Sequence, residues 1–418
     1  MTPSNLPMRL AVLLFLALIG PASVSAAAQL TTDAELIDRV ADLMSQRLAL
    51  MPEVAAIKAR RGQPVTDPAR ERAVIDRARS DARSLHLDPD AAAAIFAVQI
   101  RMANTVEEHW TGVWRDAAKA PPPARDLVTA IRPELDRLGV ELFRALYLAS
   151  PALIEITPAE LTRRLSRLLT QPGTSELQLA ELVRALGQLK MTAPPTWATV
   201  QRAGVLRVGT TGDYAPFSEN RDGRLEGTDI DLAEQIAKAW GVSALFVQTS
   251  WPSLMSDLAQ RRFDLAASGI TLTPERRRAA DFSAPYAFDG KVPIARRADA
   301  LKFSSLAKID RPGVRVIVNP GGTNERFARE HLRQATIVLH PDNRTIFDEL
   351  VADRADVMIT DSLEARLQEQ RHPELKITVA EPFTRAAKAI LLPPGSDLTG
   401  QVDAWLAAWE VKRRSVRR

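Results

Sequence analysis

Two positively charged residues interrupt an apolar stripe near the start of the chain. Apolar residues recur at helical spacing from Val40 to Val54, and Arg47 and Lys58 fall on the same stripe because the steps alternate between four and three residues. Pro52 is expected to kink this helix between the two cations. A charge on an inward face must be paired or must serve a ligand. The pattern therefore predicts inward-facing cations.

Two further cations and one carboxyl group extend this pattern. Arg70 lies in the first turn of a helix predicted to start at Asp67, where a cation opposes the helix dipole. Arg132 lies one turn from apolar residues on a later helix, and Glu107 falls on the apolar stripe of a helix predicted over 91–114. Internal Arg–Glu pairing explains each residue taken singly. Taken together, the excess of inward positive charge points to an anionic ligand.

A second group of chemically active residues lies between Asp264 and Tyr286. A short apolar run ends at Ser268 and Gly269, as expected for a buried parallel strand, and hydroxyl and arginine side chains follow it. In open α/β sheets, ligands bind beyond the carboxyl ends of the strands. An arginine there, such as Arg276, can form a two-pronged bond to a carboxylate.

The elements that must position these residues divide the chain into two domains. Residues 30–189 have helical periodicity throughout and predict an all-α domain, followed by a Pro-containing linker at 190–197. From residue 198 to 418, strands and helices alternate, which predicts parallel α/β sheet. We expect two lobes here, the first at 198–295 with 383–418 and the second at 298–380, separated by a cleft that can close on a ligand.

Residues 1–26 have the organisation of a secretory signal peptide. Arg9 precedes the apolar run from Leu10 to Ile19, and small residues at Val24-Ser25-Ala26 provide a cleavage site. A membrane anchor is the alternative, but the run is too short to span a bilayer comfortably. We therefore expect an exported protein that has no membrane attachment after cleavage.

The composition excludes several kinds of site. The 418 residues include no cysteine, so disulfides, thiol catalysis and zinc–thiolate sites are excluded. The five histidines show no metal-ligand spacing, and no nucleotide-binding loop is present. The net charge of +4 is spread over mixed charges without a basic block, which argues against nucleic acid. We expect no metal and no organic cofactor.

Several motifs of the second domain resemble a known family. SGITLTPERRRAADFSAPY resembles the ligand-binding signature of periplasmic amino-acid-binding proteins. GVLRVGTTGDYAPFSE, NPGGTNERFA, HPDNRTIFDEL and ITDSLEARL narrow the resemblance to periplasmic cyclohexadienyl dehydratases, across roughly residues 198–418. This resemblance implies a binding-protein fold that dehydrates and decarboxylates prephenate or arogenate in the periplasm.

The resemblance also implies roles for residues of the cleft. Arg276 would hold a ligand carboxylate with help from Thr271, Tyr214 and Trp251 would enclose a planar ring, and Asp361 would take an ammonium group. Glu364, three residues after Asp361 and on the same helical face, would donate a proton. The remaining substrate-binding candidates are Thr211, Asp213, Ser268, Gly269, Gly322, Thr323 and Asn324. The alternatives are purely structural roles: core packing for Trp251, a turn for Asp213 and a solvated ion pair for Glu364.

The helical domain resembles the exported class of chorismate mutases. The segments SQRLALMPEVAAIKARRG, DPARERA, ARSLHLDPDAAAAIFAVQIR and APPPARDL follow that family in order over residues 36–189. Arg47, Arg70 and Arg132 would then bind the two carboxylates of chorismate. Lys58 and Glu107 would contact its ether oxygen, and Asp67 would orient neighbouring cations or a substrate hydroxyl.

The chain departs from that family at positions that normally carry polar groups. Ala103 stands where relatives place a hydroxyl residue, and Val74 stands where a relative has Gln. Exported mutases are typically dimers, so the resemblance implies a homodimer formed through the helical domain.

Together these features predict a bifunctional enzyme with small anionic substrates: chorismate, prephenate and, as an alternative to prephenate, arogenate. The rival from another class is a periplasmic binding or sensor protein that holds an amino acid without turnover. A second rival makes the helical domain a docking module, which the inward cations oppose.

Overall fold

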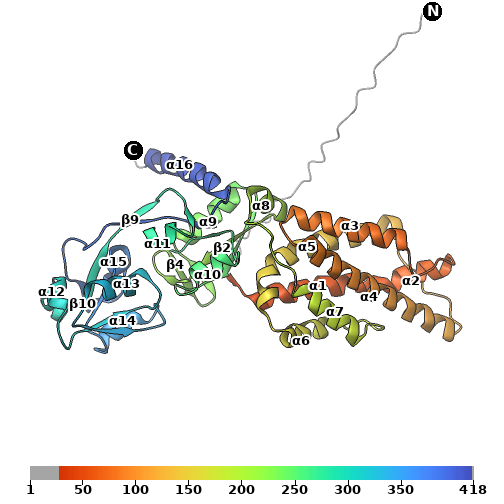
Figure 1. The fold of residues 1–418 in the computed structure, drawn as a ribbon, viewed down its shortest axis with the longest axis horizontal. Coiled ribbons are helices and arrows are strands. Elements are labelled where there is room, and N and C mark those ends of the chain that lie inside the picture. The colour runs from red at the N-terminus through yellow and green to blue at the C-terminus, as the bar shows by residue number, and fades with distance from the viewer. Residues whose placement is uncertain (1–27, 417–418) are drawn as a thin grey trace, which may run out of the picture.

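The computed structural model describes residues 28–416, with side chains up to residue 410, so the predicted signal peptide at 1–26 lies outside the described residues. An all-helical domain and a two-lobed α/β domain lie end to end along the long axis of the molecule (Figure 1). The helical domain consists of α1 (Asp33–Ala49), α2 (Met51–Arg60), α3 (Pro68–Ser84), α4 (Pro89–Asp116), a π-helical turn η1 (Leu127–Ile131), α5 (Arg132–Glu155), α6 (Pro158–Leu168) and α7 (Glu176–Leu186).

Local sequence signals explain where these helices begin. The side chain of Asp67 accepts a hydrogen bond from the Arg70 backbone N–H and caps α3, with Pro68 in the first turn, as predicted. The predicted single helix around Pro52 is instead two helices, α1 and α2, which meet at Leu50. Proline cannot donate to the helix ladder, so the break falls just before it.

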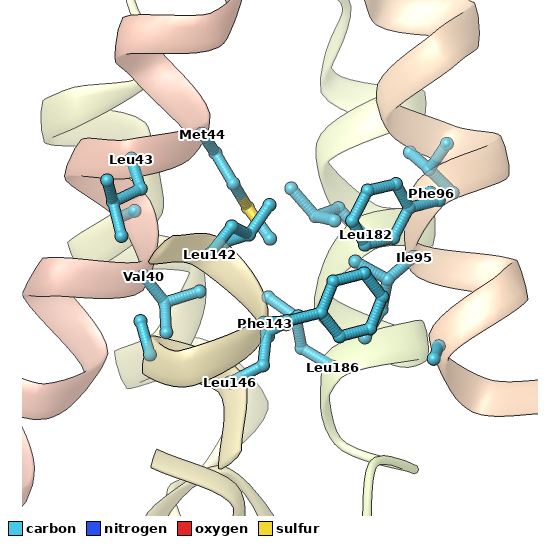
Figure 2. Close-up of a cluster of buried hydrophobic side chains, with 14 of the residues drawn as sticks. Val40, Leu43, Met44, Ile95, Phe96, Leu142, Phe143, Leu146, Leu182 and Leu186 are labelled. Atoms are coloured by element: carbon cyan, nitrogen blue, oxygen red, sulfur yellow. The ribbon is translucent and has the colours of Figure 1, made fainter. Parts of the chain in front are cut away.

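Side chains from α1, α4, α5 and α7 meet in one apolar core (Figure 2). The rings of Phe96 on α4 and Phe143 on α5 stack with their centroids 4.9 Å apart. The labelled side chains around them are Val40, Leu43, Met44, Ile95, Leu142, Leu146, Leu182 and Leu186. This core fixes the helices that carry the predicted charged residues.

The first lobe is built on a six-stranded mixed sheet in the order β1-β6-β2-β7-β16-β8. The predicted parallel pairing is confirmed for β1, β6, β2 and β7, and β16 adds an antiparallel strand between β7 and β8. The elements are β1 (Leu30–Thr31), α8 (Trp197–Ala203), β2 (Val205–Thr210), β3 (Asp213–Tyr214), β4 (Ser218–Arg221), β5 (Arg224–Glu226), α9 (Thr228–Ala239), β6 (Ser243–Gln248), α10 (Leu254–Ala259), β7 (Leu265–Ala266), α11 (Pro274–Arg277), β8 (Asp281–Phe282), β16 (Leu391–Leu392) and α16 (Leu398–Val416).

The second lobe has a five-stranded sheet in the order β12-β11-β13-β10-β14, in which β10 is antiparallel to both neighbours. Its elements are β10 (Lys291–Arg296), a 3-10 helix η2 (Arg297–Phe303), α12 (Leu306–Ile309), β11 (Arg315–Val318), α13 (Thr323–His331), β12 (Thr336–Leu339), α14 (Ile346–Val351), β13 (Val357–Asp361), α15 (Ser362–Arg371) and β14 (Leu375–Ile377). The predicted boundary between the lobes, at residues 295–298, lies too late in the sequence, because it assigns most of β10 to the first lobe. The lobes join through the antiparallel pair β9 (Ala287–Asp289) and β15 (Ala386–Lys388).

The first described strand crosses the predicted domain boundary. β1, which comes before the helical domain in sequence, pairs in parallel with β6, and Leu30 lies opposite Phe246. The start of the region predicted as helical, at residues 30–31, therefore belongs to the sheet of the first lobe. A two-residue strand gives no period-2 pattern of its own, so only the tertiary pairing reveals it.

A residue of the helical domain contacts a fully buried ion pair of the α/β domain. The Arg207 guanidinium on β2 lies 2.7 Å from Asp264 at the start of β7, and neither side chain is exposed. Tyr147 on α5 donates its hydroxyl to Asp264 at 3.0 Å, and the Arg207 guanidinium lies over the Tyr147 ring at 4.4 Å. The helical domain therefore completes a charged cluster that belongs to the α/β domain.

No helix within the described residues combines the length and the apolar character needed to cross a bilayer.

Replacing Tyr147 with Phe removes one donor to the buried Asp264 carboxylate without changing the packing of the ring. We expect Tyr147→Phe to lower the free energy of unfolding by about 1.5–3 kcal/mol, the range for a hydrogen bond to a charged group. Denaturant unfolding of the full chain measures this loss. The control is a double-mutant cycle with Asp264→Asn, and strictly additive effects would contradict the coupling.

Candidate active sites

The helical domain encloses a cavity of about 200 Å³ lined by residues of α1, α2, α3, α4 and the η1–α5 segment. Its lining includes all six residues that the sequence singled out in this domain: Arg47, Lys58, Asp67, Arg70, Glu107 and Arg132. These side chains come from positions up to 85 residues apart (47 and 132), and the helix packing brings them to one place.

Lys58 and Glu107 form a close ion pair at the cavity. The Lys58 Nζ lies 2.8 Å from Glu107 Oε2, and the Glu107 side chain is only 4% exposed. Burial raises the pKa of Glu107 to about 6, although the Lys58 ammonium group opposes the increase. Lys58 also donates to the Val65 carbonyl at 2.6 Å. The pair thus presents an ammonium group beside a carboxyl group that can take up a proton near neutral pH.

Arg47 is half-buried, and its guanidinium has hydrogen-bond donors that remain available to a ligand. Its Nη1 donates to the Leu135 carbonyl at 2.9 Å, and its guanidinium lies 5.7 Å from the centre of the Phe96 ring. Among the described residues, no carboxylate lies within 4.0 Å of it. Burial lowers the pKa of Arg47 to about 10, which leaves it charged at neutral pH. A cation held in this way suits an anionic ligand.

Asp67, Arg70 and Arg132 line the cavity but are exposed residues. The expectation that every cation of this set faces the domain interior is therefore wrong for Arg70 and Arg132. Both lie close to helix starts, where the chain is still at the surface and a side chain reaches the cavity from its open edge. The Asp67 side chain accepts a hydrogen bond from the Arg70 backbone N–H and so caps α3.

The cleft of the α/β domain is centred on Asp361, at the end of β13. Its Oδ1 lies 2.8 Å from Lys291 Nζ, its Oδ2 lies 2.6 Å from Lys388 Nζ, and Tyr214 donates its hydroxyl to Oδ2. Burial opposes ionisation, but the two ammonium groups outweigh it and hold the pKa of Asp361 well below its usual range. Asp361 was expected to face the cleft ready for a ligand ammonium group, yet two lysines already occupy its oxygens.

Sequence reasoning missed both of these lysines. Lys388 is 1% exposed and lies in the apolar run AAKAILL. A charged residue inside an apolar run is a signal of the same kind as Arg47 on its apolar helix stripe. Lys291 follows Gly290 at the first crossing between the lobes and also donates to Thr323 at 2.9 Å and to Asn324. A search for charged residues inside apolar runs, applied to strands as well as to helices, would have found Lys388.

Glu364 lies on α15, behind Asp361. It is buried, and it accepts hydrogen bonds from the Thr360 hydroxyl and from Asn343 Nδ2, the latter at 3.0 Å. Burial raises the pKa of Glu364 to about 8, and the neighbouring Asp361 carboxylate adds to the increase. The alternative of a solvated helix residue is therefore wrong for Glu364. Glu364 is therefore protonated over much of the neutral range.

A short chain of hydrogen bonds connects Glu364 to the cleft. Asn324 Nδ2 donates to Thr360 Oγ1 at 3.1 Å, and Thr360 in turn contacts Glu364. Asn324 lines the cleft together with Gly322, Thr323 and Asn319. It therefore lies between the buried Glu364 and the space for a ligand. Asn319, Asn343 and Thr360 are further residues that sequence reasoning did not single out.

On the first lobe, Arg276 and Thr271 lie together at the cleft. Arg276 Nη1 donates to the Thr271 carbonyl at 3.0 Å, and burial lowers the pKa of Arg276 to about 10. Thr271 Oγ1 accepts from Lys388 Nζ at 3.0 Å. Among the described residues, Arg276 has no carboxylate within 4.0 Å, so its remaining donors suit a ligand carboxylate.

Tyr214 and Trp251 do not form two parallel faces. Their ring centroids are 5.4 Å apart at an interplanar angle of 87°, an edge-to-face contact, because the Tyr214 hydroxyl is drawn towards Asp361. Trp251 Nε1 donates to Asp213 Oδ1 at 3.1 Å, and burial raises the pKa of Asp213. The expected enclosure of a ring between the two aromatic faces is therefore absent in this arrangement.

Three of the remaining candidates support the cleft from behind. Thr211 and Ser268 share a buried hydroxyl contact at 2.7 Å, and the Gly269 N–H donates to Asp229 at 2.6 Å. These groups are thus satisfied within the protein. Gly269 has φ of +62°, and a Cβ there would lie 2.5 Å from the Phe217 ring, so glycine is required.

The two lobes meet closely. The central space of the cleft measures about 20 Å³, enough for little more than one water molecule. Ion pairs cross between the lobes on both sides, Arg371 with Glu219 and Arg326 with Glu275, each at 2.8 Å. A substrate of the size of a ring with two carboxylates therefore requires the lobes to open. Within the described residues, no cluster of His, Asp and Glu has the arrangement of a metal site.

These features define an α/β solute-binding protein fold with a charged cleft, joined to a helical domain with a cationic cavity. Residues 206–412 match the family described as bacterial extracellular solute-binding proteins, family 3, and residues 33–108 match chorismate mutase type II. The second domain is 50% identical over 209 residues to the cyclohexadienyl dehydratase of Pseudomonas aeruginosa, covering 50% of this chain and 78% of that protein.

Through its second domain, the chain belongs to the cyclohexadienyl dehydratase family, and its first domain is a chorismate mutase type II domain. The L-cystine-binding protein TcyJ of Escherichia coli K12 is 29% identical over 47% of this chain and 74% of that protein. A crystal structure of the ancestral amino-acid-binding protein AncCDT-1, a precursor of cyclohexadienyl dehydratase, matches with 35% identity and a TM-score of 0.49, covering 51% of this chain and 93% of that one.

Proposed function

We propose that the chain carries out two consecutive reactions. The helical domain rearranges chorismate to prephenate, and the two-lobed domain converts prephenate to phenylpyruvate by loss of water and carbon dioxide. Support comes from the family memberships of the two domains and from the charges at each site. The observation that supports the proposal most directly is the position of Glu364, a buried acid with a pKa of about 8, beside a cleft rich in cations.

The first reaction needs no nucleophile. The rearrangement of chorismate is unimolecular, so the enzyme must hold a compact dianion and stabilise charge at the breaking ether bond. Arg47, Arg70 and Arg132 line the cavity from three different helices and bind the two carboxylates in this proposal. The Lys58–Glu107 pair faces the ether oxygen, which develops negative charge as the bond breaks.

The second reaction needs a proton. The bond between a ring carbon and the hydroxyl group breaks, and the hydroxyl leaves as water only if an acid protonates it. The bond to the ring carboxylate also breaks, and its electron pair completes the aromatic ring as carbon dioxide departs. Glu364 supplies the proton in this proposal, directly or through Thr360, and Arg276 holds the carboxylate that remains on the side chain.

A coupled assay tests the whole proposal. The purified chain receives chorismate alone, and phenylpyruvate is measured. Formation of phenylpyruvate supports both activities, whereas prephenate that accumulates without further reaction would leave only the mutase. Amino-acid binding without turnover, the function of TcyJ-like relatives, would appear as ligand-dependent stabilisation of the second domain with no product from prephenate.

The occupied Asp361 oxygens bear on the choice between prephenate and arogenate. An ammonium group on the substrate finds this carboxylate already paired with Lys291 and Lys388, whereas a second carboxylate finds two neighbouring cations. We therefore expect kcat/KM for prephenate to exceed that for arogenate by at least about tenfold, the effect of 1.4 kcal/mol. Competition between the two purified substrates measures the ratio, and an equal or reversed ratio would contradict the expectation.

Glu364→Gln removes the acid but keeps the size and the hydrogen-bonding capacity of the side chain. We expect dehydratase turnover to fall by about 10²–10⁴-fold, the contribution of general acid catalysis, while mutase activity stays unchanged. Because only the protonated acid donates, turnover of the unmodified chain should be level below the Glu364 pKa of about 8 and fall above it. Near-normal turnover in the variant would reject Glu364 and direct attention to Asp361 or Asp213.

Arg47→Ala should abolish mutase activity and leave dehydratase activity intact. The half-buried guanidinium provides a substrate contact whose loss costs about 2–5 kcal/mol of binding. Arg39→Ala is the matched control, because Arg39 lies on the same helix but is exposed and paired with Asp42 and Glu141. A decrease of less than tenfold in the chorismate kcat/KM of Arg47→Ala would place Arg47 outside the site.

We also propose that the protein acts in the periplasm after removal of residues 1–26, and that the helical domain forms a homodimer. Membership of an extracellular solute-binding family supports export, and the dimer rests on the resemblance to exported mutases. N-terminal sequencing of the exported protein and its mass in solution test the two points.

A further inference from the structure

We propose that Gln99 is a substrate-binding residue of the mutase site and that its side-chain amide donates a hydrogen bond to the substrate carboxylate that Arg47 holds. This rests on the proposed mutase function and adds to it a contact that neither the motifs nor the matched families assign. The occupant is the carboxylate of a small dianion, because the cavity that Gln99 lines contains the Arg47 guanidinium and has more cationic than anionic side chains in its lining.

The first observation is the unusual burial of Gln99. It lies in the middle of α4 and is only 5% exposed, yet its Nε2 has no hydrogen-bond partner among the residues that the structure describes. A buried amide without a partner costs free energy, and most such groups in proteins are satisfied. Gln99 lines the same cavity as Arg47 and Glu107, so a ligand in that cavity is within its reach.

The second observation is the polarity of the surrounding wall. Val74 on α3 and Ala103 on α4 also line the cavity and provide no hydrogen-bonding side chain. Ala103 lies one turn after Gln99 on the same face of α4, so the amide stands next to the apolar part of the wall. Gln99 and Asn104 are neutral donors of α4 that line the cavity. Asn104 Nδ2 already donates to Glu71 at 3.1 Å, whereas Gln99 Nε2 has no partner among the described residues.

The position along α4 decides which substrate group the amide meets. Gln99 lies eight residues before Glu107, about 12 Å along the helix axis, so it is remote from the Lys58–Glu107 pair. It lies three residues after Phe96, whose ring is in contact with the Arg47 guanidinium. The amide therefore belongs to the Arg47 end of the cavity, where the proposed mechanism places a carboxylate.

The test uses the full chain with chorismate as substrate. Gln99→Met keeps the length of the side chain and removes the donor, and we expect KM for chorismate to rise by about 10- to 100-fold, the effect of losing a hydrogen bond to a charged group. We expect a smaller change in kcat, because Gln99 is remote from the breaking bond. Dehydratase activity on prephenate and the unfolding temperature should match those of the unmodified chain.

Gln46→Met is the matched control. Gln46 is adjacent to Arg47 in sequence, but it is exposed and donates to Asp42 at 2.9 Å, so its replacement should leave KM unchanged. A normal KM in Gln99→Met, with the unmodified chain active, would overturn the proposal. Absence of mutase activity in the unmodified chain would instead overturn the proposed function and this proposal with it.

A second variant decides the matter if Met at position 99 destabilises the domain. Gln99→Glu places a carboxyl group against the substrate carboxylate and donates only when protonated. We expect its KM to be higher than that of the unmodified chain at pH 8 and to fall by about tenfold per pH unit as the pH falls towards the carboxyl pKa. If Gln99 had a purely structural role, the ratio of the KM of Gln99→Glu to the KM of the unmodified chain would not change with pH. That result would overturn the proposal.

Discussion

A hydrogen bond from Tyr147 to the buried pair of Arg207 and Asp264 links the helical domain to the α/β domain. Both side chains are withdrawn from water, and removal of one partner from such a pair typically costs about 3–5 kcal/mol. Asp264 also accepts from the Arg207 backbone N–H at 2.7 Å and from Tyr147 of the helical domain. Since the pair spans β2 and β7, the strands that lead into the cleft depend on a contact with the mutase domain.

The same cost of burying charge distinguishes structural from functional residues elsewhere. Arg207 is paired with a carboxylate of its own protein, whereas Arg47 and Arg276 have no carboxylate within 4.0 Å in the described part of the chain. Asp361 is an intermediate case, because two lysines satisfy it and at the same time bring positive charge to the cleft. Anionic substrates are the ligands that such an arrangement favours.

The two sites meet different chemical demands with related means. The cavity of the helical domain is lined by four cations, and burial raises the pKa of one of its carboxyl groups, Glu107, to about 6. Beside the cleft, the acid Glu364 lies in a dry environment that keeps it protonated near neutral pH, whereas Asp361 is held ionised. In both sites burial is the main cause of the raised pKa, and a neighbouring charge adjusts it.

Sequence reasoning was most successful where one helix or one turn contains the whole signal. Arg47, Lys58 and Glu107 stand on helical stripes, and the structure places all three at one cavity as the periodicity suggested. It failed for β1, for Lys291 and for the edge-to-face contact of Tyr214 with Trp251. Each of these depends on chain segments far apart in sequence, which local periodicity does not report.

The sequence by itself determined the two-domain organisation, the helix start at Asp67, and the acids and cations that carry the proposed chemistry, because capping, periodicity and motifs are local properties. Only the tertiary structure decided that β1 joins the sheet of the second domain, that Asp361 is shared by two lysines, and that the Gln99 amide is left without a partner. Pairing and burial depend on which distant segments meet, and the free energy of a charge or an amide is fixed only by those neighbours.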